Sequence, residues 1–256
     1  MTETEKRMVE KELDRLASIP ASAMMMVRIP LVLLLDCSGS MRRFHNVLKA
    51  IVTELCGELK FGTLFDFTLC VIMIHNSVPR LFYLGELFDF DESAFVENMP
   101  EEYGMTPLAS AYTMAEELLH RVSQTLESQR HWHTIPVFLS FTDTEENGSL
   151  DDVSDAKARF RRDIAESKKL LIEFVTADNP DGLDLGGYRV PIKDTSDLDT
   201  VKRIMEILRY MSTTTVKQGD SLHDCPMKSD RLAYCRYKSD MLLFNFKIFF
   251  ENYYSE

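Results

Sequence analysis

The stretch from Leu31 to Met41 reads LVLLLDCSGSM, and it decides how the chain folds. Residues 29–36 form a continuous apolar run that ends in a carboxylate, as expected for a central parallel strand covered on both faces. Two hydroxyls, Ser38 and Ser40, follow Asp36 at alternate positions. Apolar residues at spacings of three and four then predict a helix from residue 44 to 59. The sequence thus predicts a buried strand, a polar loop and a helix in direct succession.

Beyond this stretch, strand and helix patterns alternate along the chain. The turn at residues 76–79 is too short for a parallel crossover, so its two flanking strands should form an antiparallel hairpin with the second strand at an edge. The alternation predicts an α/β fold: a doubly wound, mostly parallel six-stranded sheet with one antiparallel edge strand and helices on both faces, Rossmann-like in architecture. The further strands are expected at 67–75, 80–87, 135–141, 170–177 and 188–192, and the further helices at 92–98, 108–126, 153–168 and 198–212.

The two ends of the chain differ from the central region. Residues 1–27 are expected to form an N-terminal helical extension, whose charged helix over 3–18 docks loosely on the surface. The α/β domain is expected to span residues 28–215. Residues 216–256 form a C-terminal extension in which an aromatic run over 241–254 alternates with polar residues. That alternation suggests a strand, but the run is too apolar to exclude a helix.

Composition limits the kinds of partner. The 256 residues carry a net charge of −12, which argues against nucleic acid because phosphate binding needs a basic surface. The five cysteines are odd in number and widely spaced, which indicates reduced thiols and a cytoplasmic location. The charged N-terminus does not resemble a signal peptide, and no apolar run approaches the roughly 18 residues of a membrane span. We therefore expect a soluble protein without a membrane partner.

Two carboxylates from distant parts of the sequence are predicted to meet. Asp36 ends the first strand and Asp143 follows the strand at 135–141. The winding of the sheet should reverse between these two strands, and ligands of such sheets bind beyond the carboxyl ends of the strands at that reversal. At a separation of about 5 Å and an effective dielectric near 20, the two charges would repel by about 3 kcal/mol. A divalent cation would remove that cost.

Three hydroxyls could complete an oxygen ligand set for that cation: Ser38, Ser40 and Thr106. Each has an ordinary explanation when taken alone, since Ser40 could cap a helix and Thr106 precedes a proline. Asp143 alone could form a strand-end turn. Together they point to metal binding, and an all-oxygen set with few carboxylates suits Mg²⁺, with Mn²⁺ as a substitute.

These residues carry a resemblance to a known family. The pattern Asp36-x-Ser38-x-Ser40, then Thr106 in GMTPL, then Asp143 after a threonine resembles the complete metal-ion-dependent adhesion site of von Willebrand factor A (VWA) domains. The resemblance covers about residues 28–215, and the tight DCSGSM form is most similar to the bacterial tellurium-resistance-associated group. It implies that the two serines and sometimes the threonine bind Mg²⁺ directly, that the aspartates often act through water, and that Mn²⁺ or Ca²⁺ can substitute.

The resemblance also implies a function. In the family, a partner protein supplies an Asp or Glu that completes the coordination of the ion, so the chain is expected to be an adaptor or scaffold and not an enzyme. The tellurium-resistance group implies a stress-response or phage-defence setting with kinase or phosphatase partners. Two alternatives stay open: a metal-dependent hydrolase that uses Asp36 or a bound water, and an accessory subunit of an AAA-type ATPase. The sequence has neither a G-x-S-x-G elbow nor a P-loop.

Two positions depart from the family pattern. Met105 stands where a second glycine is common, and Thr144 replaces the usual glycine after the aspartate. Glycine gives a loop conformational freedom that other residues lack. These departures leave the predicted metal ligands unchanged, but they weaken the expectation that the loops switch between open and closed forms.

Overall fold

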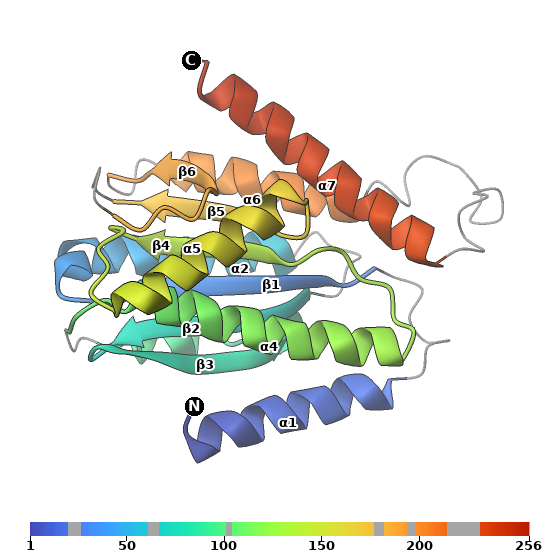
Figure 1. Cartoon of the computed structure of the whole chain (residues 1–256), viewed down its shortest axis with the longest axis horizontal. Coiled ribbons are helices and arrows are strands. Elements are labelled where there is room, and N and C mark those ends of the chain that lie inside the picture. The colour runs from blue at the N-terminus through green and yellow to red at the C-terminus, as the bar shows by residue number, and fades with distance from the viewer. Residues whose placement is uncertain are drawn as a thin grey trace.

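A six-stranded sheet in the order β3-β2-β1-β4-β5-β6 carries the fold (Figure 1). The computed structural model describes residues 1–19, 27–60, 67–100, 104–176, 182–193, 198–213 and 231–255. The strands are β1 (Ile29–Asp36), β2 (Phe67–His75), β3 (Val78–Glu86), β4 (Val137–Thr142), β5 (Leu170–Val175) and β6 (Tyr188–Pro191). The α-helices are α1 (Glu3–Ser18), α2 (His45–Lys60), α3 (Glu92–Glu97), α4 (Leu108–Ser128), α5 (Leu150–Ala165), α6 (Leu198–Thr213) and α7 (Arg231–Tyr253), and two short 3₁₀ helices are η2 (Ser40–Phe44) and η3 (Leu87–Asp89).

The sheet is wound in both directions from β1. This strand pairs in parallel with β2 on one side and with β4 on the other. β5 and β6 continue in parallel beyond β4, and β3 pairs antiparallel with β2 at the edge. The predicted doubly wound sheet with one antiparallel edge strand is therefore confirmed, and the reversal of winding lies between β1 and β4, where it was expected.

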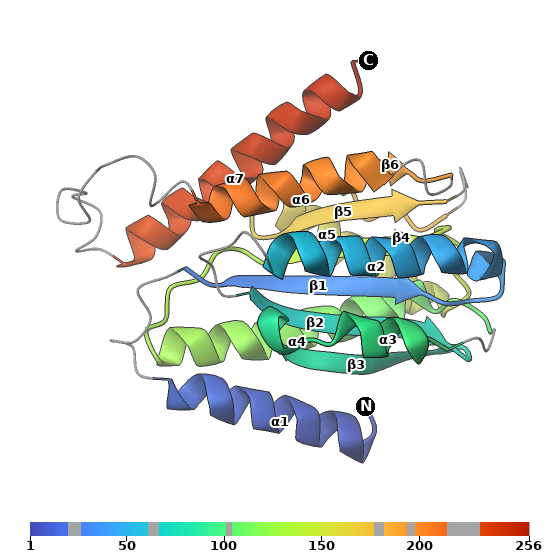
Figure 2. The same cartoon turned by 180° about the vertical axis from the view of Figure 1, so that it is seen from behind.

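Two layers of helices cover the two faces of the sheet (Figures 1 and 2). All eight residues of β1 are buried, and its side chains alternate between the two core clusters. Leu33 and Leu35 face the layer that contains α2 and α6, whereas Val32 and Leu34 face the layer that contains α1, α4 and α5. A strand covered in this way must be apolar on both faces, which explains the uninterrupted run at residues 29–35.

Helix α1 is docked closely, contrary to the expectation of a loose surface helix. Val9 and Leu16 are fully buried against the layer of α4. The Glu5 carboxylate is also buried, and its Oε1 accepts a hydrogen bond of 3.0 Å from the backbone N–H of Leu81 on edge strand β3. An unpaired edge N–H is a template for aggregation, so α1 both contributes to the core and occupies part of this edge.

The aromatic run near the C-terminus forms helix α7, and the suggested strand is wrong. Leu242, Phe246 and Phe250 recur at intervals of four and are buried, and the ring of Phe250 stacks on Tyr188 of β6 with centroids 4.2 Å apart. Aromatic residues lie on every side of this helix, so a two-residue alternation coexists with helical periodicity. Although α7 has 23 residues, no described helix is long and apolar enough to cross a membrane.

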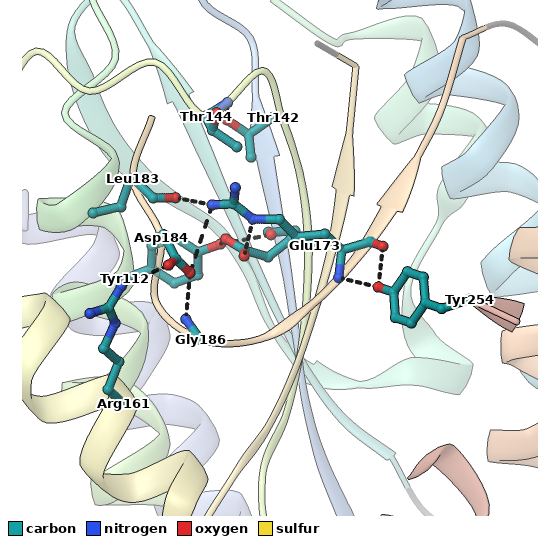
Figure 3. A network of polar contacts seen from close by, with 11 residues as sticks. Tyr112, Thr142, Thr144, Arg161, Glu173, Leu183, Asp184, Gly186 and Tyr254 are labelled. Atoms are coloured by element: carbon teal, nitrogen blue, oxygen red, sulfur yellow. Dashed lines mark hydrogen bonds and ion pairs between the residues drawn. The ribbon is translucent and has the colours of Figure 1, made fainter. Parts of the chain in front are cut away.

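A buried polar network joins the last three strands (Figure 3). Ser140, Glu173 and Arg189 lie opposite one another on β4, β5 and β6. The Tyr112 hydroxyl of α4 lies 2.7 Å from Ser140 Oγ and 3.1 Å from Glu173 Oε1. Arg189 Nε donates to Glu173 Oε2 at 3.4 Å, and its Nη2 donates to the carbonyl of Leu183 at 2.6 Å. Each carboxylate oxygen of Glu173 thus has a donor, as a buried charge requires.

Burial controls the ionisation of Glu173. The side chain has no exposed surface, and burial raises the pKa of its carboxyl from 4.5 to about 6, although the charge of Arg189 and the hydrogen bond from Tyr112 favour the ionised form. The folded state therefore holds this proton more tightly than the unfolded chain does. Consequently, the contribution of Glu173 to the free energy of unfolding falls as pH rises from about 4.5 to 6.

We predict that Glu173→Gln removes this pH dependence. Between pH 4 and pH 7, the wild-type protein should lose about 2 kcal/mol more unfolding free energy than the variant does, because a difference of one pKa unit corresponds to 1.36 kcal/mol. Urea unfolding of both proteins at a series of pH values measures the difference, and the other carboxyl groups cancel in the comparison. Parallel stability profiles would contradict the burial of an ionisable Glu173.

The docking of α1 gives a second prediction. Leu16→Ala should lower the free energy of unfolding by about 2–5 kcal/mol, because it leaves a cavity under a fully buried side chain. The matched control is Leu150→Ala, since Leu150 is 86% exposed and its truncation should change stability by less than about 0.5 kcal/mol. Equal effects of the two substitutions in urea unfolding would show that α1 does not belong to the core.

Candidate metal centre

The first predicted carboxylate, Asp36, lies at the carboxyl end of β1 beside the end of β4. Leu35 pairs with Phe141, so the next residues of the two strands, Asp36 and Thr142, are neighbours at this edge. Asp36 Oδ1 accepts a hydrogen bond from the backbone N–H of Ser38 at 3.0 Å, and Oδ2 accepts one from Thr142 Oγ1 at 2.9 Å. These two contacts fix the direction of a carboxylate that has no exposed surface.

Two carboxylates influence each other at this edge. Burial raises the pKa of Asp36 to about 6, the hydrogen bonds from Ser38 and Thr142 oppose that rise, and the negative charge of Asp143 adds to it. Asp143 directly follows β4 and is also buried, with Oδ1 accepting from the backbone N–H of Glu145 at 3.1 Å. The structure therefore brings Asp36 and Asp143 within electrostatic reach in a place that favours a compensating positive charge.

The two serine hydroxyls of the first loop lie together. Ser38 Oγ is 3.1 Å from Ser40 Oγ, with Ser38 buried and Ser40 exposed. The cap of η2 is Gly39, and no side chain makes a capping hydrogen bond there. Ser40 therefore does not cap this helix, which was the ordinary explanation for its position. Both hydroxyls carry lone pairs that a cation could use.

Backbone hydrogen bonds hold the loop that carries Thr106 to the other two loops. The N–H of Gly39 donates to the carbonyl of Gly104 at 3.3 Å, and the N–H of Asn147 donates to the carbonyl of Thr106 at 2.9 Å. Thr106 is buried, and helix α4 is capped at Pro107 without a side-chain hydrogen bond, so Thr106 does not act as a side-chain cap. The loops that carry the five predicted ligands thus lie against one another at one end of the sheet.

Thr144 adopts a backbone conformation that favours glycine. Its φ is +64°, in the left-handed region that a β-branched residue rarely adopts. Its N–H donates to Thr142 Oγ1 at 2.9 Å and its carbonyl accepts from Leu183 N–H at 2.9 Å. A β-carbon on Gly182 would lie only 2.1 Å from Thr144 Oγ1, so glycine is required there. Hydrogen bonds thus hold the backbone of Thr144 to Thr142 and to Leu183. That its loop does not readily switch between open and closed forms stays a prediction.

Met105, the second departure, lies at the rim of the site. Its side chain is 59% exposed, and its backbone N–H donates to Ser77 Oγ at 2.8 Å. This contact ties the Thr106 loop to the turn between β2 and β3. The structure therefore gives Met105 a fixed backbone and an apolar side chain that faces solvent.

Sequence reasoning missed Thr142 as a partner of Asp36. Thr142 Oγ1 contacts both the Asp36 carboxylate and the N–H of Thr144, so it links the first and third loops. The available signal was a hydroxyl at the end of an otherwise apolar strand, directly before the predicted ligand Asp143. Such a residue is well placed to orient ligands rather than to bind an ion itself.

The donor set fits a hard cation. The loops offer the carboxylates of Asp36 and Asp143 and three hydroxyls, all of them oxygen donors of the kind that Mg²⁺ and Mn²⁺ prefer. Across the described stretches, no three His, Cys, Asp or Glu side chains gather into a group that could hold a metal ion. An ion at this edge would therefore depend on the hydroxyls as well as on the two carboxylates.

Comparison with known proteins places the fold. No family model matches the chain, and no curated protein matches it. Among solved structures, the VWA domain of SpRpn10 is 12% identical, with a TM-score of 0.49 over 67% of this chain and 93% of that one. A von Willebrand factor type A protein from Catenulispora acidiphila is 17% identical, with a TM-score of 0.49 over 70% of this chain and 42% of that one. The open form of the pilus adhesin SpaC from Lactobacillus rhamnosus GG is 11% identical, with a TM-score of 0.50 over 74% of this chain and 31% of that one. At 11% identity, the likeness to SpaC shows a shared α/β fold and nothing more.

Proposed function

We propose that this chain is a Mg²⁺-dependent protein-binding module that engages a carboxylate of its partner. Asp36, Ser38, Ser40, Thr106 and Asp143 would hold the ion, with Mn²⁺ or Ca²⁺ as substitutes. The observation that carries the proposal is the fully buried Asp36 carboxylate, which lies beside two hydroxyls that do not cap η2 and within reach of the Asp143 charge. The resemblance of the sequence pattern to the adhesion site of VWA domains supports the same assignment.

The residues of the site would have different roles in holding the ion. Ser38, Ser40 and Thr106 present hydroxyl oxygens, while Asp36 is held by Ser38 N–H and Thr142 Oγ1 so that its loop keeps one shape. When bound, the ion supplies a Lewis-acidic position that can accept an Asp or Glu of another protein. Five protein ligands would leave one position of an octahedral ion open, and an external carboxylate could fill it.

The setting of this binding is also part of the proposal. The resemblance to the tellurium-resistance-associated group supports a cytoplasmic role in a bacterial stress-response or phage-defence system. In that setting the chain would act as an adaptor or scaffold, without catalysis of its own, and its partner would be a kinase, a phosphatase or an ATPase. The acidic charge of the chain favours a partner surface that is basic around the engaging carboxylate.

Metal binding can be tested directly. We expect Ser38→Ala and Asp143→Ala each to weaken Mn²⁺ or Mg²⁺ binding by at least about tenfold, because each removes an oxygen donor. Even the loss of a residue that only orients a metal ligand typically lowers metal affinity by about that factor. Isothermal titration calorimetry measures the affinity, and circular dichroism checks that each variant is folded. Asp155→Ala is the matched control, since Asp155 is an exposed carboxylate of α5 and its loss should leave binding unchanged. Unchanged affinity in both site variants would exclude this metal centre.

Partner capture tests the role of the metal. Immobilised chain should retain a protein from a host lysate in Mg²⁺, release it in EDTA, and retain it again when Mg²⁺ is restored, because the ion bridges the two proteins. The Asp143→Ala variant should capture nothing specific, whereas Asp155→Ala should behave as wild type. Capture that is indifferent to chelation and to Asp143→Ala would replace this proposal with a metal-independent scaffold.

A further inference from the structure

The loop of residues 182–187 joins strand β6 to the loop that carries Asp143. The backbone of Leu183, a residue that is 1% exposed, makes this connection. Its N–H donates to the carbonyl of Thr144 at 2.9 Å, and its carbonyl accepts from Arg189 Nη2 at 2.6 Å (Figure 3). A single buried residue thus links a side chain of β6 to the backbone beside a predicted metal ligand.

Two further hydrogen bonds continue this connection to the carboxylate of Asp36. The N–H of Thr144 donates to Thr142 Oγ1 at 2.9 Å, and Thr142 Oγ1 donates to Asp36 Oδ2 at 2.9 Å. Asp143 lies between these two threonines in the chain, so contacts on both sides hold its backbone. The series of contacts therefore runs from Arg189 to both carboxylates of the candidate metal centre.

Close packing adds to the hydrogen bonds where the two loops meet. A β-carbon on Gly182 would lie 2.1 Å from Thr144 Oγ1 and 2.9 Å from the Thr144 carbonyl oxygen, so the loops touch without space between them. A threonine with a φ of +64° keeps that conformation only where its surroundings hold it. Release of the loop 182–187 would therefore let the backbone beside Asp143 relax.

Arg189 uses separate donors for its two partners. Nε donates to Glu173 Oε2 at 3.4 Å, whereas Nη2 makes the shorter bond of 2.6 Å to the Leu183 carbonyl. The ion pair with Glu173 compensates a buried charge, and that role does not require the bond to Leu183. Because the guanidinium is planar and holds its donors at a fixed spacing, anchoring of Nε on Glu173 also sets the place of Nη2. A lysine could compensate the charge but could not reproduce this pair of donors.

We propose that Arg189 is a positioning residue of the candidate metal centre. It holds the loop 182–187 against Thr144 and thereby fixes the backbone that presents Asp143 to a divalent cation. The inference rests on the proposed function, because it requires an ion bound between Asp36 and Asp143. Loss of a residue that orients metal ligands without touching the ion typically lowers metal affinity by about 10–100-fold.

Calorimetric titration of the full chain with MnCl₂ tests this role. Arg189→Lys keeps a positive charge beside Glu173 but loses the paired donors, so it should weaken Mn²⁺ binding by at least about tenfold while circular dichroism stays that of the folded protein. Arg159→Lys is the matched control and should bind Mn²⁺ as wild type does. Arg159 also bridges two partners, Glu116 Oε2 at 3.2 Å and Thr113 Oγ1 at 2.8 Å, and it is exposed to a similar extent.

The outcomes separate this inference from the proposed function. Equal affinity of wild type and a folded Arg189→Lys variant would overturn the positioning role and leave the proposed function standing. Equal weakening by Arg189→Lys and Arg159→Lys would also overturn the positioning role. A wild type that binds no Mn²⁺ would contradict the proposed function, and this inference with it.

A second variant separates the contact with Leu183 from the burial of charge. In a Glu173→Gln background no buried carboxylate needs a cation, so Arg189→Met can be added without leaving a charge unpaired. The double variant should bind Mn²⁺ at least about tenfold more weakly than Glu173→Gln alone. Equal affinities of these two proteins would overturn the inference, whether or not Arg189→Lys folds.

Hydrogen exchange gives a readout that does not depend on titration. If attachment of the loop 182–187 strengthens metal binding, a bound ion must strengthen that attachment by the same factor. Exchange of the Leu183 N–H should therefore slow in Mg²⁺ relative to the amides of α1, which report general stabilisation. Arg189→Lys should abolish this difference. Exchange at Leu183 that is indifferent to Mg²⁺, in a wild type that binds the ion, would overturn the inference.

Discussion

The burial of β1 on both faces, ending in a carboxylate, is the constraint on which the rest of the structure depends. All eight residues of this strand are buried, so two layers of helices and a strand on each side are required to cover it. The last residue, Asp36, cannot reach bulk water and must find its donors within the protein. It finds them in Ser38 N–H and Thr142 Oγ1, and the second of these exists only because β4 lies beside β1. The winding of the sheet and the shape of the candidate site are therefore one arrangement.

The sequence predicted the parts of the fold whose pattern is local. The bounds expected for β1 and β2, 29–36 and 67–75, agree with the structure because strands buried on both faces are apolar throughout and stop abruptly at polar residues. The sequence did not decide the structure of residues 241–254: it favoured a strand and left a helix open, because large aromatic residues occur on all sides of α7. The prediction that α1 docks loosely was wrong. The helix attaches partly through the buried carboxylate of Glu5, and a local sequence pattern does not indicate which charged residue will be buried.

The candidate site could likewise be predicted only in part from the sequence. The proximity of Asp36 and Asp143 followed from topology, because parallel strands on either side of a winding reversal end at one edge of the sheet. The contact of Thr142 with Asp36 and the left-handed backbone of Thr144 depend on the pairing of β1 with β4 and on the approach of Gly182. Such contacts join residues more than thirty positions apart, so only the assembled structure reveals them.

Side chains near the two termini occupy part of each edge of the sheet. At the β3 edge, Glu5 of α1 accepts the N–H of Leu81, and at the β6 edge, the Tyr254 hydroxyl lies between the N–H and the carbonyl of Arg189. Each contact occupies backbone groups that would otherwise pair with another chain. The helices at the ends of the chain therefore protect the sheet as well as enlarge its core.

Strand β6 shows what the ion pair between the buried Glu173 and the partly exposed Arg189 contributes to the fold. Four residues form its ladder with β5, and a pleated strand this short would specify its register weakly by apolar contacts alone. A slip of one residue would turn the Arg189 side chain to the other face of the sheet, which would leave the buried Glu173 carboxylate without its cation. The unpaired charge would cost several kcal/mol, far more than the pair itself contributes to stability. The Glu173–Arg189 pair therefore selects one register for β6, and that register fixes the place where Tyr254 and α7 attach.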